Sequence, residues 1–537
     1  MRTPTAEEDV LAILNAPWSA AEEAALAPLL DEVTHLASLG YSQLQIEQLV
    51  PEARVEVLQH HAALTGLGFE LAQICGIGKR PQSLGVMADL YADLKSSLPS
   101  LNKNDFVTIA RTRAGNLALR EFLYVVNVSS VTRPPLSLSD KQLATIASHG
   151  GRPALRVVGP LGTELAEAHG LSGAQVTRIA SHIGGKHAME AVQRLLPSLK
   201  RDFHLSTEQV VAIASKNGGN VALESVSEHL PELCAEPYSL TVEQVVGIAS
   251  RLGGNQALRA VQRSLPALRQ EFRLTTEEVV NVASKVGGGQ ALEALETLLP
   301  ELCADFGLTV DQVVSIASND GGRKALEAVK QLMPKLRDEF GFTTSQVVMM
   351  TTSGGARQTL KAVLSLYPML RDSFHLTTTQ VTAIARTRCG TRALEAVFVL
   401  LPELRDDLGL TIEEVVAVAA NSSGSNALKA LHRWLPPLRN RWNLTNAQVV
   451  DIARGAGGSQ SLAAIYRLLP KLCAAPHSWT VDDVLAMAGK YEGARALEGF
   501  ELVMRALETD PADPVSRDID TIAQALDEYG ESIEYRP

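Results

Sequence analysis

The sequence predicts an all-α fold, a solenoid of helix hairpins stacked one on the next. Three observations support this: near-copies of one motif recur at 34- or 35-residue spacing, each copy shows helical periodicity twice, and a Gly-Gly pair separates the two stretches. One hairpin cannot bury its apolar face alone, so neighbouring copies must stack. The 537 residues are 46% hydrophobic but only 4% aromatic, which favours many thin, similar layers over one thick core.

Each repeat predicts a short first helix and a longer second helix. In "LTVEQVVGIAS", Val245, Ile248 and Ala249 share one helical face behind a Thr that can cap the helix. The Gly-Gly pair then ends this helix, and "NQALRAVQRSLPALRQEF" predicts a second helix with Leu258 and Val261 facing inward. The copies start at Leu171, Leu205, Leu240, Leu274, Leu308, Phe342, Leu376, Leu410 and Leu444.

Variation between copies is concentrated at the two residues before the glycines. "IASKNGGNVALESV" (213–226) carries Lys216-Asn217 there, whereas "IASRLGGNQALRAV" (248–261) carries Arg251-Leu252. Glycines in this tight loop permit φ above zero and close approach of another molecule, and the unpaired N–H groups that begin the second helix suit a phosphate. Stacking would align the loops along one edge, so the sequence predicts a recognition edge.

Charge and cysteine usage narrow the possible partners. The net charge of −11 is concentrated at the ends, −6 in residues 1–40 and −7 in residues 508–537, which leaves about +2 for residues 41–507. A nucleic-acid partner therefore remains possible. Cys234, Cys303 and Cys473 hold the same place in different repeats, so neither a disulfide framework nor a metal site is expected. We expect no membrane span and no cleaved signal, because the chain has no long apolar run and "MRTPTAEEDVLAIL" lacks a signal core.

The sequence contains no recognisable catalytic constellation. It has no nucleophile elbow, Walker loop or zinc-hydrolase motif, so we expect no enzyme, no catalytic residues, no cofactor and no small-molecule substrate. His60 and His61 are adjacent on a predicted helix and point apart, which indicates a capping role and no metal site. Two functions remain open: DNA binding, or a helical-repeat scaffold that binds a protein partner, the commoner role of paired-helix solenoids.

The repeats and their flanks resemble the transcription activator-like (TAL) effector family and its TAL-like relatives, over about Leu39 to Ala506. "LGYSQLQIEQL" and "VLQHHAALTGLGF" look like the N-terminal cap of that family. "SLGVMADLYADLKSSLP" and "FVTIARTRAGNLALREF" look like its degenerate repeats, and "LSDKQLATIASHGGRPAL" has the one-residue-shorter loop of its introductory repeat. The resemblance implies a right-handed superhelical solenoid of 33–35-residue helix-hairpin repeats, with these parts: an acidic helical N-terminal extension (1–38), an N-terminal cap with degenerate repeats (39–137), the introductory repeat (138–170), nine TAL-like repeats (171–478), a terminal degenerate repeat (479–506) and an acidic tail (507–537).

The resemblance also implies a role for each loop position. One repeat would face one base pair of double-stranded DNA in the major groove, with one side chain reading the base edge and the residue before it bracing the loop. The implied base-reading residues are Arg113, Ile183, Asn217, Leu252, Val286, Asp320, Gly354, Arg388, Ser422 and Ala456, with a degenerate Tyr491 last. The implied bracing residues are His182, Lys216, Arg251, Lys285, Asn319, Ser353, Thr387, Asn421 and Gly455. The implied phosphate contacts are Gly184, Gly185, Lys186, Gly218, Gly219, Gly253, Gly254, Gln256, Gly287, Gly288, Gln290, Gly321, Gly322, Lys324, Gln358, Arg392, Gly457, Gly458 and Gln460.

Several readers have a physical interpretation. Asp320 can accept from cytosine N4, Asn217 can donate to purine N7, and Gly354 leaves room for a thymine methyl group. Arg113 stands where most of the family carries tryptophan, and its fork of donors suits guanine, so we expect a 5′ guanine. A guanine is expected opposite Arg388 on the same grounds. The family associates Ile183 with adenine and treats Ser422 as permissive, whereas Leu252, Val286, Ala456 and Tyr491 are not its common readers.

The resemblance sets the expected biological role. It implies a monomeric transcription factor or effector acting in the bacterial cytoplasm or, if secreted, in a host nucleus. Glu47 and Glu52 stand in a cap that is usually lysine-rich, which predicts modest non-specific DNA affinity. In the acidic tail, Val515, Ile519 and Ile522 recur at helical spacing, which fits either a helix that covers the last repeat or a recruiting segment.

Overall fold

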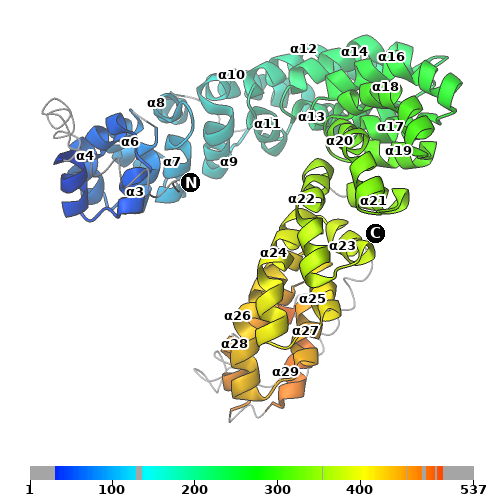
Figure 1. Cartoon of the computed structure of the whole chain (residues 1–537). Coiled ribbons are helices and arrows are strands. Elements are labelled where there is room, and N and C mark those ends of the chain that lie inside the picture. Colours follow the sequence, from blue (N-terminus) through cyan, green and yellow to red (C-terminus); the bar gives the residue numbers. More distant parts are fainter. Residues whose placement is uncertain are drawn as a thin grey trace, which may run out of the picture. The chain divides into compact units, whose positions relative to one another are not determined.

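The computed structural model describes residues 31–80, 82–128, 136–352, 355–455, 457–474, 479–489 and 493–499. Within these ranges every regular element is a helix, and consecutive helices pack as hairpins, which confirms the predicted all-α repeat fold. The chain forms two compact units, residues 1–258 and 259–537, and their boundary falls inside α16 (Gly254–Phe272). Figure 1 labels helices of both units. The predicted extension 1–38 is described only from residue 31, where residues 31–38 form a helix, and the tail 507–537 lies outside the described residues.

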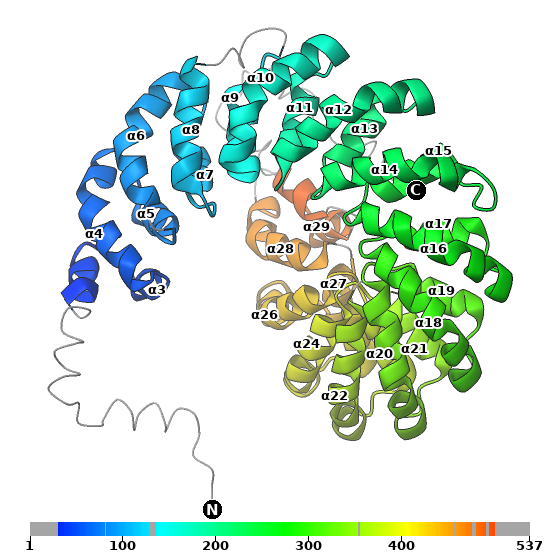
Figure 2. The same cartoon turned by 90° about the horizontal axis from the view of Figure 1, so that it is seen from above.

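In the first unit, short first helices alternate with longer second helices. The second helices α6, α8 and α10 pack side by side, and so do the first helices α5, α7 and α9 (Figure 2). The bounds are α3 (Gln43–Glu47), α4 (Pro51–Gly66), α5 (Leu71–Gly78), α6 (Ser83–Ser97), α7 (Lys103–Ala110), α8 (Gly115–Val128), α9 (Asp140–Thr145), α10 (Gly151–His169), α11 (Gly173–Ala180), α12 (Gly185–Phe203), α13 (Thr207–Ala214), α14 (Gly219–Cys234) and α15 (Val242–Ala249). A π-helical turn, Ile146–Gly150, joins α9 to α10.

The second unit continues the same alternation. Its bounds are α17 (Thr276–Ala283), α18 (Gly288–Phe306), α19 (Val310–Ala317), α20 (Gly322–Pro334), α21 (Thr344–Thr351), α22 (Ala356–Phe374), α23 (Thr378–Ala385), α24 (Gly390–Pro402), α25 (Ile412–Ala419), α26 (Gly424–Trp442), α27 (Asn446–Ala453), α28 (Gly458–Leu472) and α29 (Val481–Ala488). Pro334 and Pro402 end their α-helices, and a π-helical turn follows each of them. The equivalent prolines Pro197, Pro300 and Pro368 lie inside continuous α-helices, so the missing proline N–H alone does not account for the π-helical turns.

A capping box starts the first helix of each array repeat. In α13 the Ser206 hydroxyl accepts from the Gln209 N–H at 3.1 Å, and the Gln209 side chain accepts from the Ser206 N–H at 2.8 Å. In α15 Thr241 and Gln244 form the same reciprocal pair. Two otherwise unpaired donors are satisfied at each helix start, and each cap contributes about 1 kcal/mol of helix stability. The Ser/Thr-x-x-Gln/Glu frame that opens each repeat is therefore a structural signal.

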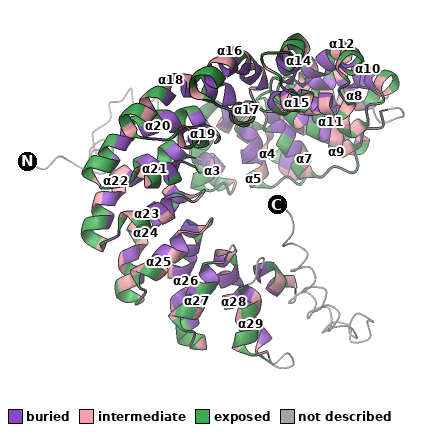
Figure 3. Cartoon of the chain, turned by 90° about the vertical axis from the view of Figure 1, so that its right-hand side faces the viewer, coloured by how far each residue is buried: buried purple, intermediate pink, exposed green. Residues whose placement is uncertain are grey.

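The core lies between the hairpins, as the periodicity predicts. Val245, Ile248 and Ala249 of α15 are fully buried, as are Leu258 and Val261 of α16. Buried and exposed residues share the same helices throughout, as on two-faced helices (Figure 3). Most of the buried side chains are Leu, Val, Ile and Ala, which explains the low aromatic content.

Candidate functional site

The variable pair of each repeat lies in the tight turn between its two helices. In one repeat α13 ends at Ala214 and α14 begins at Gly219, so Lys216 and Asn217 fall between them. The Gly219 N–H donates to the Lys216 carbonyl at 2.8 Å and closes the turn. This placement agrees with the prediction from sequence, and the closing bond uses backbone atoms that every residue type supplies.

The two glycines of the pair have different physical roles. Gly218, the first, has φ +78, and a Cβ there would meet nothing within 4 Å, so conformation alone favours glycine. Gly219, the second, lies so close to the preceding helix that a Cβ would be 2.3 Å from the Ala214 carbonyl oxygen. The missing Cβ of Gly219 thus lets its backbone lie close to the end of the preceding helix, a packing role that the sequence did not distinguish from a role at phosphate. Ala356 stands at this second place in one repeat.

The implied base-reading side chains that the structure describes are exposed. The three apolar ones are notable because a globular protein normally buries such residues: Ile183 is 80% exposed, Leu252 50% and Val286 44%. The polar readers are exposed as well: Arg113, Asn217, Asp320, Arg388 and Ser422. Gly354, Ala456 and Tyr491 lie outside the described residues.

The Asp320 carboxylate is hydrogen-bonded to the preceding loop of the same chain. Its Oδ1 accepts from the Val286 N–H at 3.1 Å, and the Gly321 N–H donates to the Val286 carbonyl at 3.2 Å. The two loops are therefore hydrogen-bonded to each other in the protein alone. An Asp320 carboxylate that accepts from cytosine can use its second oxygen or the remaining lone pair of Oδ1.

The implied bracing residues behave in several ways. Asn319 donates to the Ser315 carbonyl at 2.8 Å and Thr387 to the Ile384 carbonyl at 3.0 Å, so both brace the loop on its own first helix. Asn421 instead donates to the Gly455 carbonyl of the next loop at 2.8 Å. Lys216 and Arg251 are exposed, Lys285 is half-buried, Gly455 has no side chain to contribute, and Ser353 lies outside the described residues.

The pKa of the His182 imidazole is lowered from its ordinary value. Burial lowers the pKa of its imidazole, and the positive charge of Lys216 and the neighbouring His149 lower it further. Each of these effects disfavours the imidazolium form. His182 is therefore held neutral near pH 7 and adds no charge to this edge.

The implied phosphate contacts lie at the start of the second helices, where N–H groups are unpaired. The side chains of Gln256, Gln290, Lys324, Gln358, Arg392 and Gln460 are exposed. Lys186 is half-buried, 3.7 Å from the Glu190 carboxylate. The arrangement offers amides, cations and helix N-termini to an anion.

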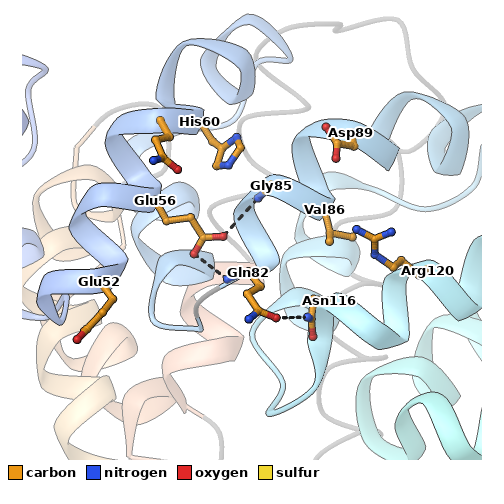
Figure 4. Close-up of a pocket in the computed structure, with 10 residues that line it drawn as sticks. Glu52, Glu56, His60, Gln82, Gly85, Val86, Asp89, Asn116 and Arg120 are labelled. Carbon is orange, nitrogen blue, oxygen red and sulfur yellow. Dashed lines mark hydrogen bonds between the residues drawn. The ribbon is translucent and has the colours of Figure 1, made fainter.

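One loop of the N-terminal cap already holds an anionic group. Gln82 starts α6 with φ +73, and its N–H donates to Glu56 Oε2 at 2.8 Å, while the Gly85 N–H lies 3.5 Å from Oε1. Figure 4 shows the Glu56 carboxylate of α4 turned toward the start of α6, beside an open pocket. Asn116 of the next hairpin donates to the Gln82 side chain at 3.0 Å. Glu56 is 26 residues from Gln82 in sequence, and no local pattern indicates this contact.

Within the described residues, no helix is long and apolar enough to cross a membrane. In that part of the chain, no group of three His, Cys, Asp or Glu side chains is placed to hold a metal ion. The five cysteines are free.

These features define a tandem helix-hairpin repeat protein whose sequence varies at the exposed loops between paired helices. The segments 183–216, 217–251, 252–285, 286–319, 320–351 and 423–454 match the TAL effector repeat, so six of the repeats are TAL effector repeats and the resemblance is confirmed. The chain is also 46% identical over 119 residues to the TAL effector protein Rip19 of Ralstonia solanacearum and to the TAL effector protein Brg11 of Ralstonia nicotianae. That stretch is 22% of this chain, but only 16% of Rip19 and 9% of Brg11.

Proposed function

We propose that this chain is a sequence-specific double-stranded DNA-binding protein that places one repeat against each base pair in the major groove. The observation that carries the proposal is the exposure of Ile183, Leu252 and Val286 at the second of the two loop positions that vary from repeat to repeat. Apolar side chains held out of the core at a variable site suit contact with base edges such as a thymine methyl group. The same chain would act as a monomer and as a transcription factor or effector.

Selection from a pool of random duplexes tests this function with the full chain. We expect an enriched motif, and affinity that falls steeply as salt rises, because displaced counterions return to the phosphates. A chain that enriches no motif, or whose DNA binding is indifferent to salt, would refute the proposal. Either result would favour the alternative function, a helical-repeat scaffold that binds a protein partner.

The finer part of the proposal is a guanine before the first base that the array reads. Arg113 is exposed at the loop between α7 and α8, where its guanidinium can reach guanine O6 and N7 together. Arg113→Ala should cost roughly 1–3 kcal/mol of binding on a G-initial duplex and much less on a T-initial one. Arg113→Lys is the matched control, because it keeps the charge but loses the bidentate fork. Equal losses on all four initial bases would make Arg113 a phosphate contact only.

A further inference from the structure

One backbone hydrogen bond closes every array loop for which the structure describes both the donor and the acceptor. The N–H that begins the second helix donates to the carbonyl three residues earlier, as in Gly219 to Lys216 at 2.8 Å and Gly390 to Thr387 at 2.9 Å. Each loop is therefore a four-residue β-turn. The base-reading residue is the second residue of that turn, and the first glycine, or its replacement, is the third.

The backbone angle of the third residue divides the array into two turn types. Gly184 (φ +88, ψ 10), Gly218 (+78, 18), Gly287 (+77, 19) and Gly321 (+77, 27) have the values of a type II turn. Cys389 (φ −108, ψ 23), Ser423 (−108, 19) and Gly457 (−105, 20) have the values of a type I turn.

The two turn types present their central peptide in opposite directions. Between type I and type II, the peptide that joins the second and third residues rotates by roughly half a turn, while the closing bond is kept. The N–H of the third residue therefore points to opposite sides in the two classes. A type II turn favours glycine at this place, so Cys389 and Ser423 hold their loops in type I, whereas Gly457 is free to adopt either form.

The cap shows what a type II N–H of this kind can bind. The Ser83 N–H donates to the Arg80 carbonyl at 3.3 Å and closes the same turn, with Gln82 as its third residue at φ +73. The Gln82 N–H donates to the Glu56 carboxylate at 2.8 Å (Figure 4). The type II orientation thus offers this donor to an anion, and here Glu56 supplies that anion.

We propose that the array contains two kinds of loop, and that Cys389 and Ser423 are positioning residues that hold their loops in type I, a form that the Gly457 loop also adopts. Type II loops present the N–H of their third residue to a DNA phosphate, and type I loops turn it away. This inference rests on the proposed DNA binding. In the Gly321 loop the N–H is held by the Val286 carbonyl at 3.2 Å, so this donor would exchange that partner for phosphate.

Neutral methylphosphonate linkages placed one at a time along the selected duplex test the assignment. With the full chain, we expect roughly tenfold or greater loss of affinity at phosphates that face type II loops, the scale of a hydrogen bond to a charged group. At the step that faces Ser423 we expect less than about twofold loss, and at the step that faces Cys389 a smaller loss than at type II loops, because the implied phosphate contact of Arg392 remains there. Uniform sensitivity along the duplex would overturn the two-class assignment while leaving DNA binding intact, whereas no binding to any duplex would overturn both.

Single substitutions at the third residue of a turn can change one loop from type I to type II or the reverse. Ser423→Gly permits type II and should create sensitivity at its own step, and Ser423→Ala is the control that removes the hydroxyl but keeps a Cβ. Gly218→Ser should do the reverse in a type II loop and abolish sensitivity there. Melting curves verify that each variant is folded. If Ser423→Gly and Ser423→Ala behave alike at this step, the turn does not set the phosphate contact and the proposal fails.

Discussion

Replacing Gly254 by alanine should destabilise the α15–α16 hairpin although alanine is the better helix former. A Cβ at Gly254 would lie 2.4 Å from the Ala249 carbonyl oxygen and 2.7 Å from its carbonyl carbon. Ordinary contact begins near 3.4 Å, so the two helix backbones must separate by about 1 Å. Such overpacking typically costs about 1–3 kcal/mol, which exceeds the gain of about 0.5–1 kcal/mol that alanine gives inside a helix.

Gly247 is a matched control in the same hairpin. It lies in α15, is exposed, and a Cβ there would meet nothing within 4 Å. Gly247→Ala should therefore stabilise the protein by about 0.5–1 kcal/mol. Urea unfolding followed by circular dichroism should move the midpoint down for Gly254→Ala and up for Gly247→Ala. If Gly254→Ala is as stable as the parent protein while the control behaves as expected, the close approach to Ala249 is not a constraint.

Three further results are expected. Burial raises the pKa of Tyr41 to about 12, so the stability gained from its neutral hydroxyl should be complete below pH 10 and decline as pH rises through 12; Tyr41→Phe should remove this decline, followed by urea midpoints. Burial and then Lys216 lower the pKa of His182, so Lys216→Gln should raise that pKa, measured by NMR titration of the ring protons, and an unchanged value would exclude the charge effect. Glu47→Lys and Glu52→Lys should each strengthen DNA binding and steepen its salt dependence by up to about one unit, and an unchanged slope would show that this face does not meet DNA.

The helices, their caps and the loop position were readable from sequence because each depends on local or periodic features. Thr241 and Gln244 lie three residues apart, so their spacing in the sequence indicates the capping box. Val245 and Ile248 are also three residues apart, which places them on one buried helical face. The sequence indicates the turn type only in part. Cys389 and Ser423 replace the first glycine and thereby indicate a changed loop, whereas Gly457 adopts the same turn without any change of residue.

Contacts between hairpins left no such signal. The bond from the Val286 N–H to Asp320 joins residues 34 positions apart, and its geometry depends on how two loops stack. The Glu56 contact with Gln82 likewise depends on the packing of α4 against α6. The segment 352–422, which contains Ala356 and Cys389, falls between the stretches that match the TAL effector repeat. Two of the departures at the glycines, Ala356 and Cys389, thus fall in this gap, whereas Ser423 lies in a stretch that matches.

Backbone closure of the loop explains why the bracing position can vary so widely. The first residue of each turn contributes its carbonyl to the closing bond, from Lys216 at 2.8 Å, Arg251 at 3.0 Å and Lys285 at 2.9 Å. Because no particular side chain is needed for this bond, a cation can replace the small polar residue without opening the turn. The second glycine cannot be exchanged so easily, since its missing Cβ is what lets the two helices approach. The frame is therefore fixed where the backbone is crowded, and the sequence is free to vary where the turn faces outward.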